Sequence, residues 1–227
     1  MPLQPQTYHS QIFRNFKALD ILEYRKIVHF YERYEKSILQ LDFTEYFEMV
    51  VAYTSALFMI EAHRKHLMMA DVVIETSIAH NITHINKEEI FLSTLREKAN
   101  SHFCLQEFSQ AEHTLRELIK METNDPLSIQ MLQRVYRDNR PVYIRYARAF
   151  AVVTFLISAL GVAVEVLFVR HFFPEWATVV EGFRNAIFSL GVCALIVPEL
   201  YHRWHVNNRV KQYVESIKSR KSTLYKY

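Results

Sequence analysis

Histidine is the residue type with the clearest potential for chemistry in this chain of 227 residues, which contains eleven of them. His63 and His66 are three positions apart, so a helix would place both imidazoles on one face. His80 and His84 are four positions apart and could share a helix face or flank its end. A structural zinc site needs four ligands, and no nearby cysteine or carboxylate pair completes either couple. We therefore predict no metal site and no cofactor.

The other catalytic patterns are incomplete or missing. Glu199 and His202 form the Glu-x-x-His half of a di-iron site in a helical bundle, but the sequence offers no second copy. Cys104 and Cys193 lie in no nucleophile motif, and Gly-x-Ser-x-Gly does not occur. All three glycines follow residue 160, so no glycine loop could hold a phosphate in the N-terminal part. The sequence predicts no catalytic residues and no enzymatic activity.

Glu165 is the only charged residue in the apolar stretch 149–169, AFAVVTFLISALGVAVEVLFV. A helix of this length spans roughly 30 Å, which matches the hydrocarbon thickness of a bilayer. An ionisable group at that depth is costly and is by default a functional candidate, facing a partner or a water-filled path. Two alternatives stay open. Glu165 lies five residues before Arg170, so it could sit near the interface, or it could be neutral and hydrogen-bonded.

A second apolar stretch at about 185–202 follows the first, and together they predict a transmembrane hairpin over residues 141–204. Small residues let helices approach closely in membranes, so we expect the two spans to pack along Gly161 and Gly191. Glu199 lies near the end of the second span and is a further candidate for a membrane function.

The two halves of the sequence differ in charge. Residues 1–140 contain 16 basic and 19 acidic residues, whereas residues 141–227 contain 11 and 5. The basic residues gather on the outer flanks of the spans, and the positive-inside rule therefore places both termini in the cytoplasm. The N-terminus has no basic region followed by an apolar core, the pattern of a secretory signal. We expect an integral membrane protein, in a bacterial inner membrane rather than an organelle membrane.

The N-terminal part reads as all-α. Neither glycine nor proline occurs between Pro5 and Pro126, and strands joined by tight turns would need such punctuation. We expect a flexible lead over 1–9, a helical domain over 10–140 and a basic cytoplasmic tail over 205–227. Within the helical domain, apolar periodicity predicts a helix from Gln11 to Leu41 that is broken near Leu19–Asp20, and a central core helix after Asp42. Capping boxes are predicted at Asp42/Glu45 and Asn86/Glu89. Further helices are predicted at Glu88–Leu105, Glu107–Met121 and Leu127–Arg137.

The most specific pattern in the N-terminal part covers Leu95–Pro126, LREKANSHFCLQEFSQAEHTLRELIKMETNDP. Two helices joined by a turn carry small and apolar residues at set positions: Ala99, Phe103, Phe108, Ala111 and Leu115. Over about residues 88–126 the chain thus resembles a tetratricopeptide repeat, whose small residues let two antiparallel helices pack closely. It departs from that family at the turn, where Gln106 replaces glycine, and at Pro126, which comes about three residues late. A generic antiparallel helix pair is the alternative.

The resemblance implies stacked helix pairs with a concave surface that binds a peptide or a partner helix. The first hypothesis is therefore a scaffold that holds a protein partner at the membrane, in contact with lipid. The second is an oligomeric two-span pore gated by its cytoplasmic domain and lined by Glu165. The third is an accessory subunit of a larger membrane complex. An acidic N-terminal part argues against nucleic acid as a partner.

Overall fold

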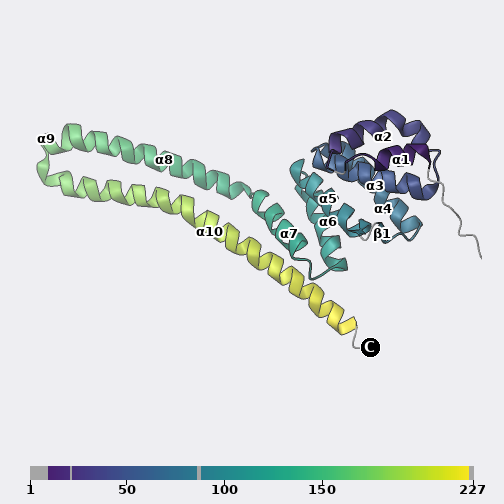
Figure 1. Ribbon diagram of the computed structural model, residues 1–227. Coiled ribbons are helices and arrows are strands. Elements are labelled where there is room, and N and C mark those ends of the chain that lie inside the picture. The colour runs from purple at the N-terminus through teal and green to yellow at the C-terminus, as the bar shows by residue number, and fades with distance from the viewer. Residues whose placement is uncertain (1–9, 21, 86–87, 225–227) are drawn as a thin grey trace, which may run out of the picture. The chain divides into compact units, whose positions relative to one another are not determined.

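The computed structural model describes residues 10–20, 22–85 and 88–224, and it is helical apart from one very short pair of strands (Figure 1). The predicted all-α fold class is therefore confirmed. The chain divides into two compact units, Met1–Val135 and Tyr136–Tyr227, and each is described by itself.

The first unit is built from consecutive helices that pack on their neighbours. Contacts link α2 to α3, α3 to α4, α4 to α5 and α5 to α6, and α3 also contacts α5. The strands His84–Ile85 (β1) and Glu88–Glu89 (β2) form an antiparallel pair before α5. The helices are α1 (Gln11–Lys17), α2 (Tyr24–Ile38), α3 (Phe43–Met59), α4 (His63–Ala79), α5 (Ile90–Cys104), α6 (Phe108–Met121) and α7 (Pro126–Asp138), the last ending just beyond the unit boundary.

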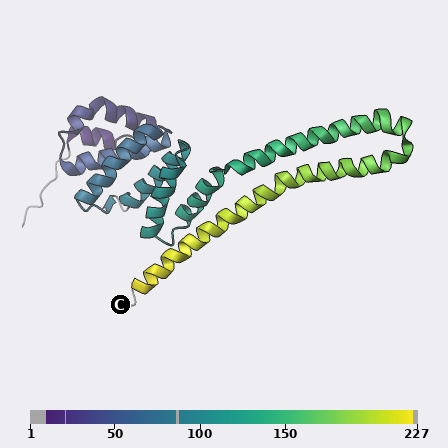
Figure 2. The ribbon, with the colours of Figure 1, turned by 180° about the vertical axis from the view of Figure 1, so that it is seen from behind.

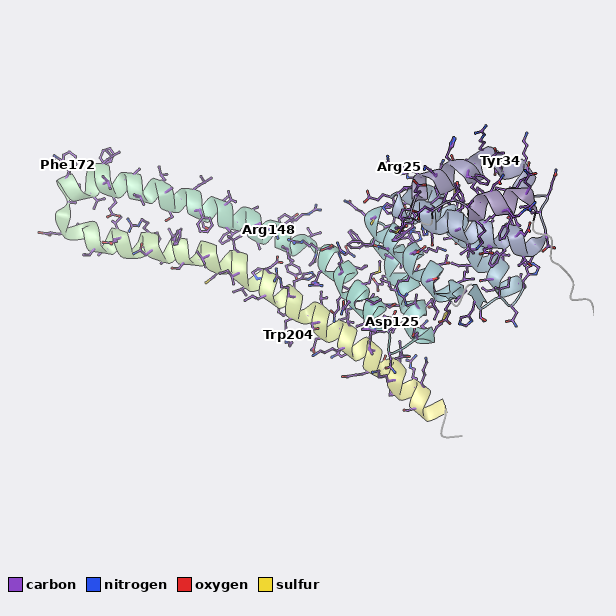
Figure 3. All side chains as sticks on the ribbon, viewed as in Figure 1. Arg25, Tyr34, Asp125, Arg148, Phe172 and Trp204 are labelled. Atoms are coloured by element: carbon purple, nitrogen blue, oxygen red, sulfur yellow. The ribbon has the colours of Figure 1, made fainter. Side chains whose placement is uncertain are left out.

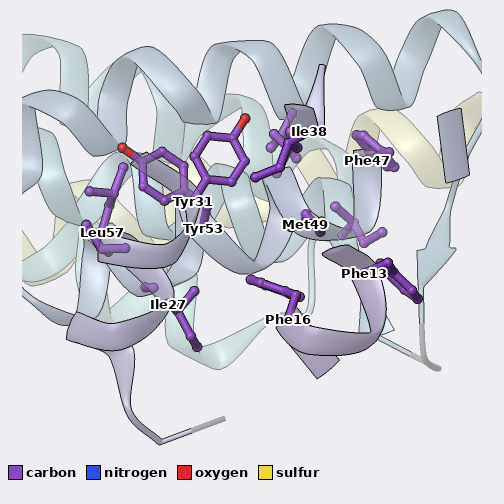
Figure 4. Packing of buried hydrophobic residues seen from close by; sticks show 14 residues of the cluster. Phe13, Phe16, Ile27, Tyr31, Ile38, Phe47, Met49, Tyr53 and Leu57 are labelled. Carbon is purple, nitrogen blue, oxygen red and sulfur yellow. The ribbon is translucent and has the colours of Figure 1, made fainter. Parts of the chain in front are cut away.

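Helix α3 supplies much of the core, as its nearly all-round apolar sequence predicts. Met49, Val50 and Leu57 are fully buried, and they share one cluster with residues of α1 and α2 (Figure 4). The rings of Tyr31 on α2 and Tyr53 on α3 stack with centroids 4.1 Å apart. The predicted break between the first two helices is also confirmed, since α1 ends at Lys17 and α2 begins at Tyr24.

The predicted capping boxes are only partly right. Asp42 caps α3 by accepting the backbone N–H of Thr44 at 3.2 Å. Glu45 does not return to Asp42 as predicted, because its carboxylate accepts the backbone N–H of Ser10 at 2.9 Å. This bond joins α3 to the start of α1 across 35 positions, a contact that local sequence spacing could not reveal. At the second box, Asn86 lies outside the described residues.

Helix α5 starts at Ile90, two residues later than predicted. Glu88 and Glu89 instead pair with Ile85 and His84 in the short ladder, and Glu89 makes no side-chain cap. Backbone groups used in a ladder cannot also begin a helix, which explains the later start.

The start of α7 is as predicted, with Pro126 in the first helical position. The Asp125 carboxylate accepts the backbone N–H groups of Leu127 and Ser128 at 3.1 and 3.2 Å, and Arg96 of α5 donates to it at 2.8 Å. Burial alone would raise the pKa of Asp125, but the hydrogen bonds from Ser128, Arg96 and Leu127 outweigh burial and lower it. The Asp125 cap therefore ties the α6–α7 turn to α5.

The first unit turns without glycine by using other residues in the left-handed region. Each occupies the position after a helix C-cap: Glu61, Asn81 and Gln106 have φ values of 61°, 52° and 62°. In each case the next backbone N–H returns to the final helical turn, as in a Schellman motif: Ala62 to Leu57, Ile82 to Ser77, and Glu107 to His102. These helices therefore end in the left-handed conformation that glycine usually adopts, although none of them has a glycine at that position.

Gln106→Gly is expected to increase the free energy of unfolding by about 1 kcal/mol, because a non-glycine residue in the left-handed region carries a steric cost of that order. The Gln106 side chain is exposed, so its removal costs little packing. Denaturant titration of the full-length protein measures the change, with Gln106→Ala as the control that keeps the Cβ. An equal gain in both variants would show that the backbone conformation is not the cause.

The second unit consists of two long helices and their connection. The chain runs through α8 (Val142–Val164), a π-helical turn (Glu165–Val169), α9 (Arg170–Phe172), a 3₁₀ turn (Pro174–Trp176) and α10 (Ala177–Leu224). Helices α8 and α10 contact each other and lie side by side in both views (Figures 1 and 2). Residues 205–224 of the predicted basic tail form the last part of α10, one helix of 48 residues that continues through Pro198 to Leu224.

Candidate functional site

A cavity of about 390 Å³ in the first unit is the best candidate for a binding site. It lies among α1, α2, α3 and α5, and most of its wall is apolar, from residues such as Phe16, Leu19, Ile27, Val51 and Ile90. Charged and hydroxyl side chains of α1, α2, α3 and α5 make up the rest of the wall, and such a mixture suits a site that binds a small molecule or a side chain. A second hollow of about 550 Å³ lies at the start of α2 and the end of α3, and its lining includes the charged residues Glu23, Arg25, Lys26 and Glu61.

Glu97 on α5 is the distinctive polar group in the cavity wall. Its carboxylate accepts the hydroxyl of Ser55 at 3.2 and 3.3 Å, and its side chain keeps 26% exposure. The other ionic groups of the wall, Lys17 and Glu48, pair with each other. Among the described residues, no lysine or arginine forms an ion pair with Glu97. The cavity wall therefore presents a carboxylate with no lysine or arginine partner in the described part of the first unit, and His66 Nε2 lies 3.5 Å from it.

A buried hydrogen-bonded chain lies behind Glu97. His66 is fully buried, with Nδ1 2.9 Å from the Ser101 hydroxyl and Nε2 3.5 Å from the Glu97 carboxylate. His63 Nδ1 approaches Ser101 at 3.2 Å. With both imidazoles neutral, His63 can donate to Ser101, Ser101 to His66, and the remaining N–H of His66 points to Glu97. His66 Nε2 thus lies beside the Glu97 carboxylate without a hydrogen bond to it.

The same chain contains a serine, a histidine and a glutamate, the residue types of a hydrolase triad. Ser101, however, is fully buried in α5, so no substrate can reach its hydroxyl. His63 and His66 thus both contact the Ser101 hydroxyl. The described part of the chain holds no group of three or more histidine, cysteine, aspartate or glutamate residues that could bind a metal ion. His80 lies at the end of α4 against the ring of Phe43, and His84 lies in β1, so these two flank the helix end.

The residues predicted to pack the helix pair lie between α5 and α6. Ala99, Ala111 and Leu115 are fully buried, and the rings of Phe103 and Phe108 meet edge to face with centroids 6.0 Å apart. The cavity is formed by other α5 residues, namely Ile90, Ser93, Thr94 and Glu97. The five predicted residues therefore serve packing and do not line the cavity, while Glu97 and Ser55 were missed because no local motif contains them.

In the second unit, Glu165 is buried to 1% exposure and pairs with Arg184 of α10 at 2.5 Å. Arg184 also donates to Asn185 at 3.2 Å and lies 3.8 Å from Glu181. A Cβ at Gly161 would lie 3.6 Å from the Arg184 side chain, an ordinary contact, so Gly161 lies beside the aliphatic part of the arginine. Glu165 thus binds a cation of its own chain where the helix widens into the π turn.

Gly191 marks a close approach of α10 to α8. A Cβ there would lie 2.5 Å from Thr154 Oγ1 and 2.9 Å from Phe155 Cε1, shorter than real contacts allow. Opposite Gly191, the buried side of α8 carries the small residues Ala151, Thr154 and Ser158. The predicted packing role is therefore seen for Gly191, whereas Gly161 makes no comparably tight approach.

The outer surfaces of α8 and α10 are apolar. Two helical stretches, Val142–Val169 and Thr178–Ser222, are long and apolar enough to cross a membrane. Only 17% and 6% of their most apolar windows are buried within the protein, unlike the core helix of a water-soluble domain. Leu156 and Leu160 on α8 and Leu167 in the π turn are about two-thirds exposed. These surfaces need apolar surroundings that the chain itself does not provide.

Glu199 lies among three arginines of the second unit. Its carboxylate lies 3.3 Å from Arg148, 3.5 Å from Arg203 and 3.7 Å from Arg140. His202, one turn further along α10, is buried to 7% exposure, and its Nε2 has no hydrogen-bond partner within the described residues. Glu199 is therefore surrounded by arginines.

No protein-family model, curated protein or solved structure matches this chain. Two features of the structure bear on its function: a cavity whose Glu97 carboxylate pairs with no lysine or arginine among the described residues, and two helices with apolar outer surfaces.

Proposed function

We propose that this protein is a membrane-anchored interaction module without catalytic activity. In this proposal α8 and α10 form a transmembrane hairpin, and the first unit binds a segment of a protein partner in the cavity at Glu97. The observation that carries the proposal is the uncompensated Glu97 carboxylate in a wall that is otherwise largely apolar.

The surface of α8 and α10 supports the anchoring role. Exposed aliphatic and aromatic side chains run from Phe150 to Phe168, a helical distance of about 27 Å that is close to the hydrocarbon thickness of a bilayer. Exposed aromatic residues flank this band along the sequence: Phe172, Phe173 and Trp176 follow it, Tyr143 and Tyr146 precede it, and Tyr201 and Trp204 lie on α10. Phe172 and Trp204 are labelled in Figure 3. Tyrosine and tryptophan are enriched at both faces of membranes. The basic flanks favour a cytoplasmic position for both termini, and a bacterial inner membrane is the membrane we propose.

The cavity indicates the chemistry of the partner segment. Apolar walls accept an aliphatic or aromatic side chain, and the Glu97 carboxylate accepts hydrogen bonds from a lysine or an arginine. A segment that combines both kinds of residue would fill the cavity and neutralise its charge. The resemblance to tetratricopeptide repeats, which bind peptides on stacked helices, points to the same class of ligand.

The alternative functions receive less support. A pore lined by Glu165 would need this carboxylate to face a water-filled path, whereas it is buried against Arg184 of the same chain. An accessory subunit of a larger membrane complex differs from the proposed module mainly in having a permanent partner, and the same cavity would serve it. Self-association through α8 and α10 is compatible with both.

Glu97→Gln is expected to weaken partner binding at least tenfold. A hydrogen bond to a charged group contributes about 1.5–3 kcal/mol, and about 1.4 kcal/mol corresponds to a factor of ten. The amide of glutamine can still accept the Ser55 hydroxyl, so the fold is kept. The measurement is quantitative mass spectrometry of proteins that co-purify with the full-length chain after mild detergent extraction from its own cells.

Glu75→Gln is the matched control, because Glu75 is an exposed residue of α4 and does not line the cavity. A partner that depends on the cavity is lost from the Glu97 variant and kept by the Glu75 variant. If both variants retain the same partners at the same level, the cavity is not the binding site.

A further inference from the structure

Three arginines converge on one glutamate in the second unit. Arg140 and Arg148 come from the start of α8 and the residues before it, and Arg203 lies one turn after Glu199 on α10. Their nitrogens lie 3.3–3.7 Å from the Glu199 carboxylate, and only Arg148 is within hydrogen-bond distance. The arginine side chains keep 42%, 52% and 66% exposure. The cluster is thus loosely closed and accessible from outside.

The charges of this cluster do not balance. Three guanidinium groups face a single carboxylate, and within the described residues these arginines form no other ion pair. Two positive charges are therefore left without a counterion among the described residues. Each guanidinium also has several N–H donors in a planar fork, a geometry that matches a phosphate group.

The cluster lies at the edge of the apolar surface. Tyr146 and Trp204, both strongly exposed, neighbour Arg148 and Arg203 along their helices. Phe150 and Leu200, also exposed, begin the aliphatic surface on the other side of the cluster. If α8 and α10 span a bilayer, this position is the depth of the lipid phosphates.

We propose that Arg140, Arg148 and Arg203 bind the phosphate of an anionic phospholipid headgroup, with Glu199 as an internal counterion that orders the empty site. This inference rests on the transmembrane role of α8 and α10 proposed above. The two uncompensated charges suit a headgroup with two negative charges, as in a lipid with two phosphodiesters, better than a zwitterionic one. The aliphatic surface next to the cluster would receive the acyl chains.

The test uses full-length protein in a non-ionic detergent and measures lipid binding by native mass spectrometry and by the shift in melting temperature. The probes are phosphatidylglycerol, cardiolipin, phosphatidylcholine and inorganic phosphate. We expect both anionic lipids to bind and to raise the melting temperature, and phosphatidylcholine to do neither. The double variant Arg148→Gln/Arg203→Gln should bind the anionic lipids at least tenfold more weakly. The matched control is Arg145→Gln, which removes an exposed arginine of α8 that does not contact Glu199.

Glu199→Gln separates a binding site from a purely structural ion cluster. It removes the internal counterion, so a binding site should take up anionic lipid more tightly. Weaker lipid binding in this variant would overturn the proposal. Equal loss in Arg145→Gln and in the double variant would also overturn it, since binding would then follow general charge.

Inorganic phosphate shows whether the cluster binds a lipid headgroup or a free phosphate ion. If phosphate alone reproduces the lipid-induced shift, the site binds a free anion and the lipid assignment is wrong. Membrane insertion is measured separately, by extraction of the cell membranes at alkaline pH. Release of the protein into the aqueous fraction would refute the proposed anchoring, whereas loss of lipid selectivity in an inserted protein refutes only the headgroup site.

Discussion

Glu165→Ala is expected to destabilise the packing of α8 against α10 by about 3–5 kcal/mol, the cost of leaving one member of a buried ion pair alone. Arg184 would keep its charge in apolar surroundings, because guanidinium does not lose its proton under these conditions. The nearest remaining acid, Glu181, lies 3.8 Å from Arg184 and is about half exposed, so it compensates poorly. Unfolding of the purified protein in mixed detergent micelles with increasing sodium dodecyl sulfate measures the loss.

The loss should appear whichever partner of the pair is removed. Arg184→Met leaves Glu165 buried without its partner, so this variant should also lose about 3–5 kcal/mol. The double variant Glu165→Met/Arg184→Met removes both charges and should recover most of the loss, since apolar replacements of buried pairs are often neutral or better. Glu181→Ala is the control and should change stability by less than about 1 kcal/mol. An Arg184→Met variant as stable as the parent would contradict this explanation.

Gly191→Leu is expected to have a comparable effect, about 3 kcal/mol, because it inserts a side chain where even a Cβ would overlap α8. The obstacle is Thr154, whose hydroxyl is held by the carbonyl of Ala151 at 2.8 Å and so does not move aside freely. The two helices must therefore separate, and they lose contact along their small-residue face. The same detergent titration measures the change.

Gly182 provides the matched control for Gly191, since a Cβ at Gly182 would meet no atom within 4 Å. Gly182→Leu should leave stability within about 0.5 kcal/mol of the parent, as expected for a surface position. Removing the obstacle should relieve a milder variant, so Thr154→Ala is expected to restore part of the loss caused by Gly191→Ala. Equal losses in Gly182→Leu and Gly191→Leu would mean that the close approach at Gly191 is not the cause of the effect.

The sequence predicts the helices of the first unit well where local signals suffice. Apolar periodicity identifies α3 as a core helix, and the Asp125-Pro126 pair identifies the start of α7. The prediction failed where an interaction crosses the chain, since the partner of Glu45 is the distant Ser10. The conformation of the turns was also not predicted, because Gln106 is left-handed and no glycine at this position indicates that conformation.

The candidate sites show the same division. Gly191 and the small residues of α5 and α6 could be predicted from residue type, since tight packing requires small side chains. Glu97 could not be predicted, because its surroundings, Ser55 and His66, come from other helices and form no motif with it. Glu165 was recognised as unusual, but its partner lies across the turn, 19 positions away, and helical spacing says nothing about which residue α10 places opposite.

The continuity of α10 has a consequence for how this chain can vary. Each residue of an α-helix turns the backbone by about 100°, and α10 passes from Gly191 to Glu199 without interruption. One inserted or deleted residue between them would swing Glu199 and Arg203 around the helix axis, away from Arg148, while Gly191 stayed in place. The number of residues in this segment is therefore constrained more strictly than their identity: aliphatic exchanges keep the angular phase, and a single insertion destroys it.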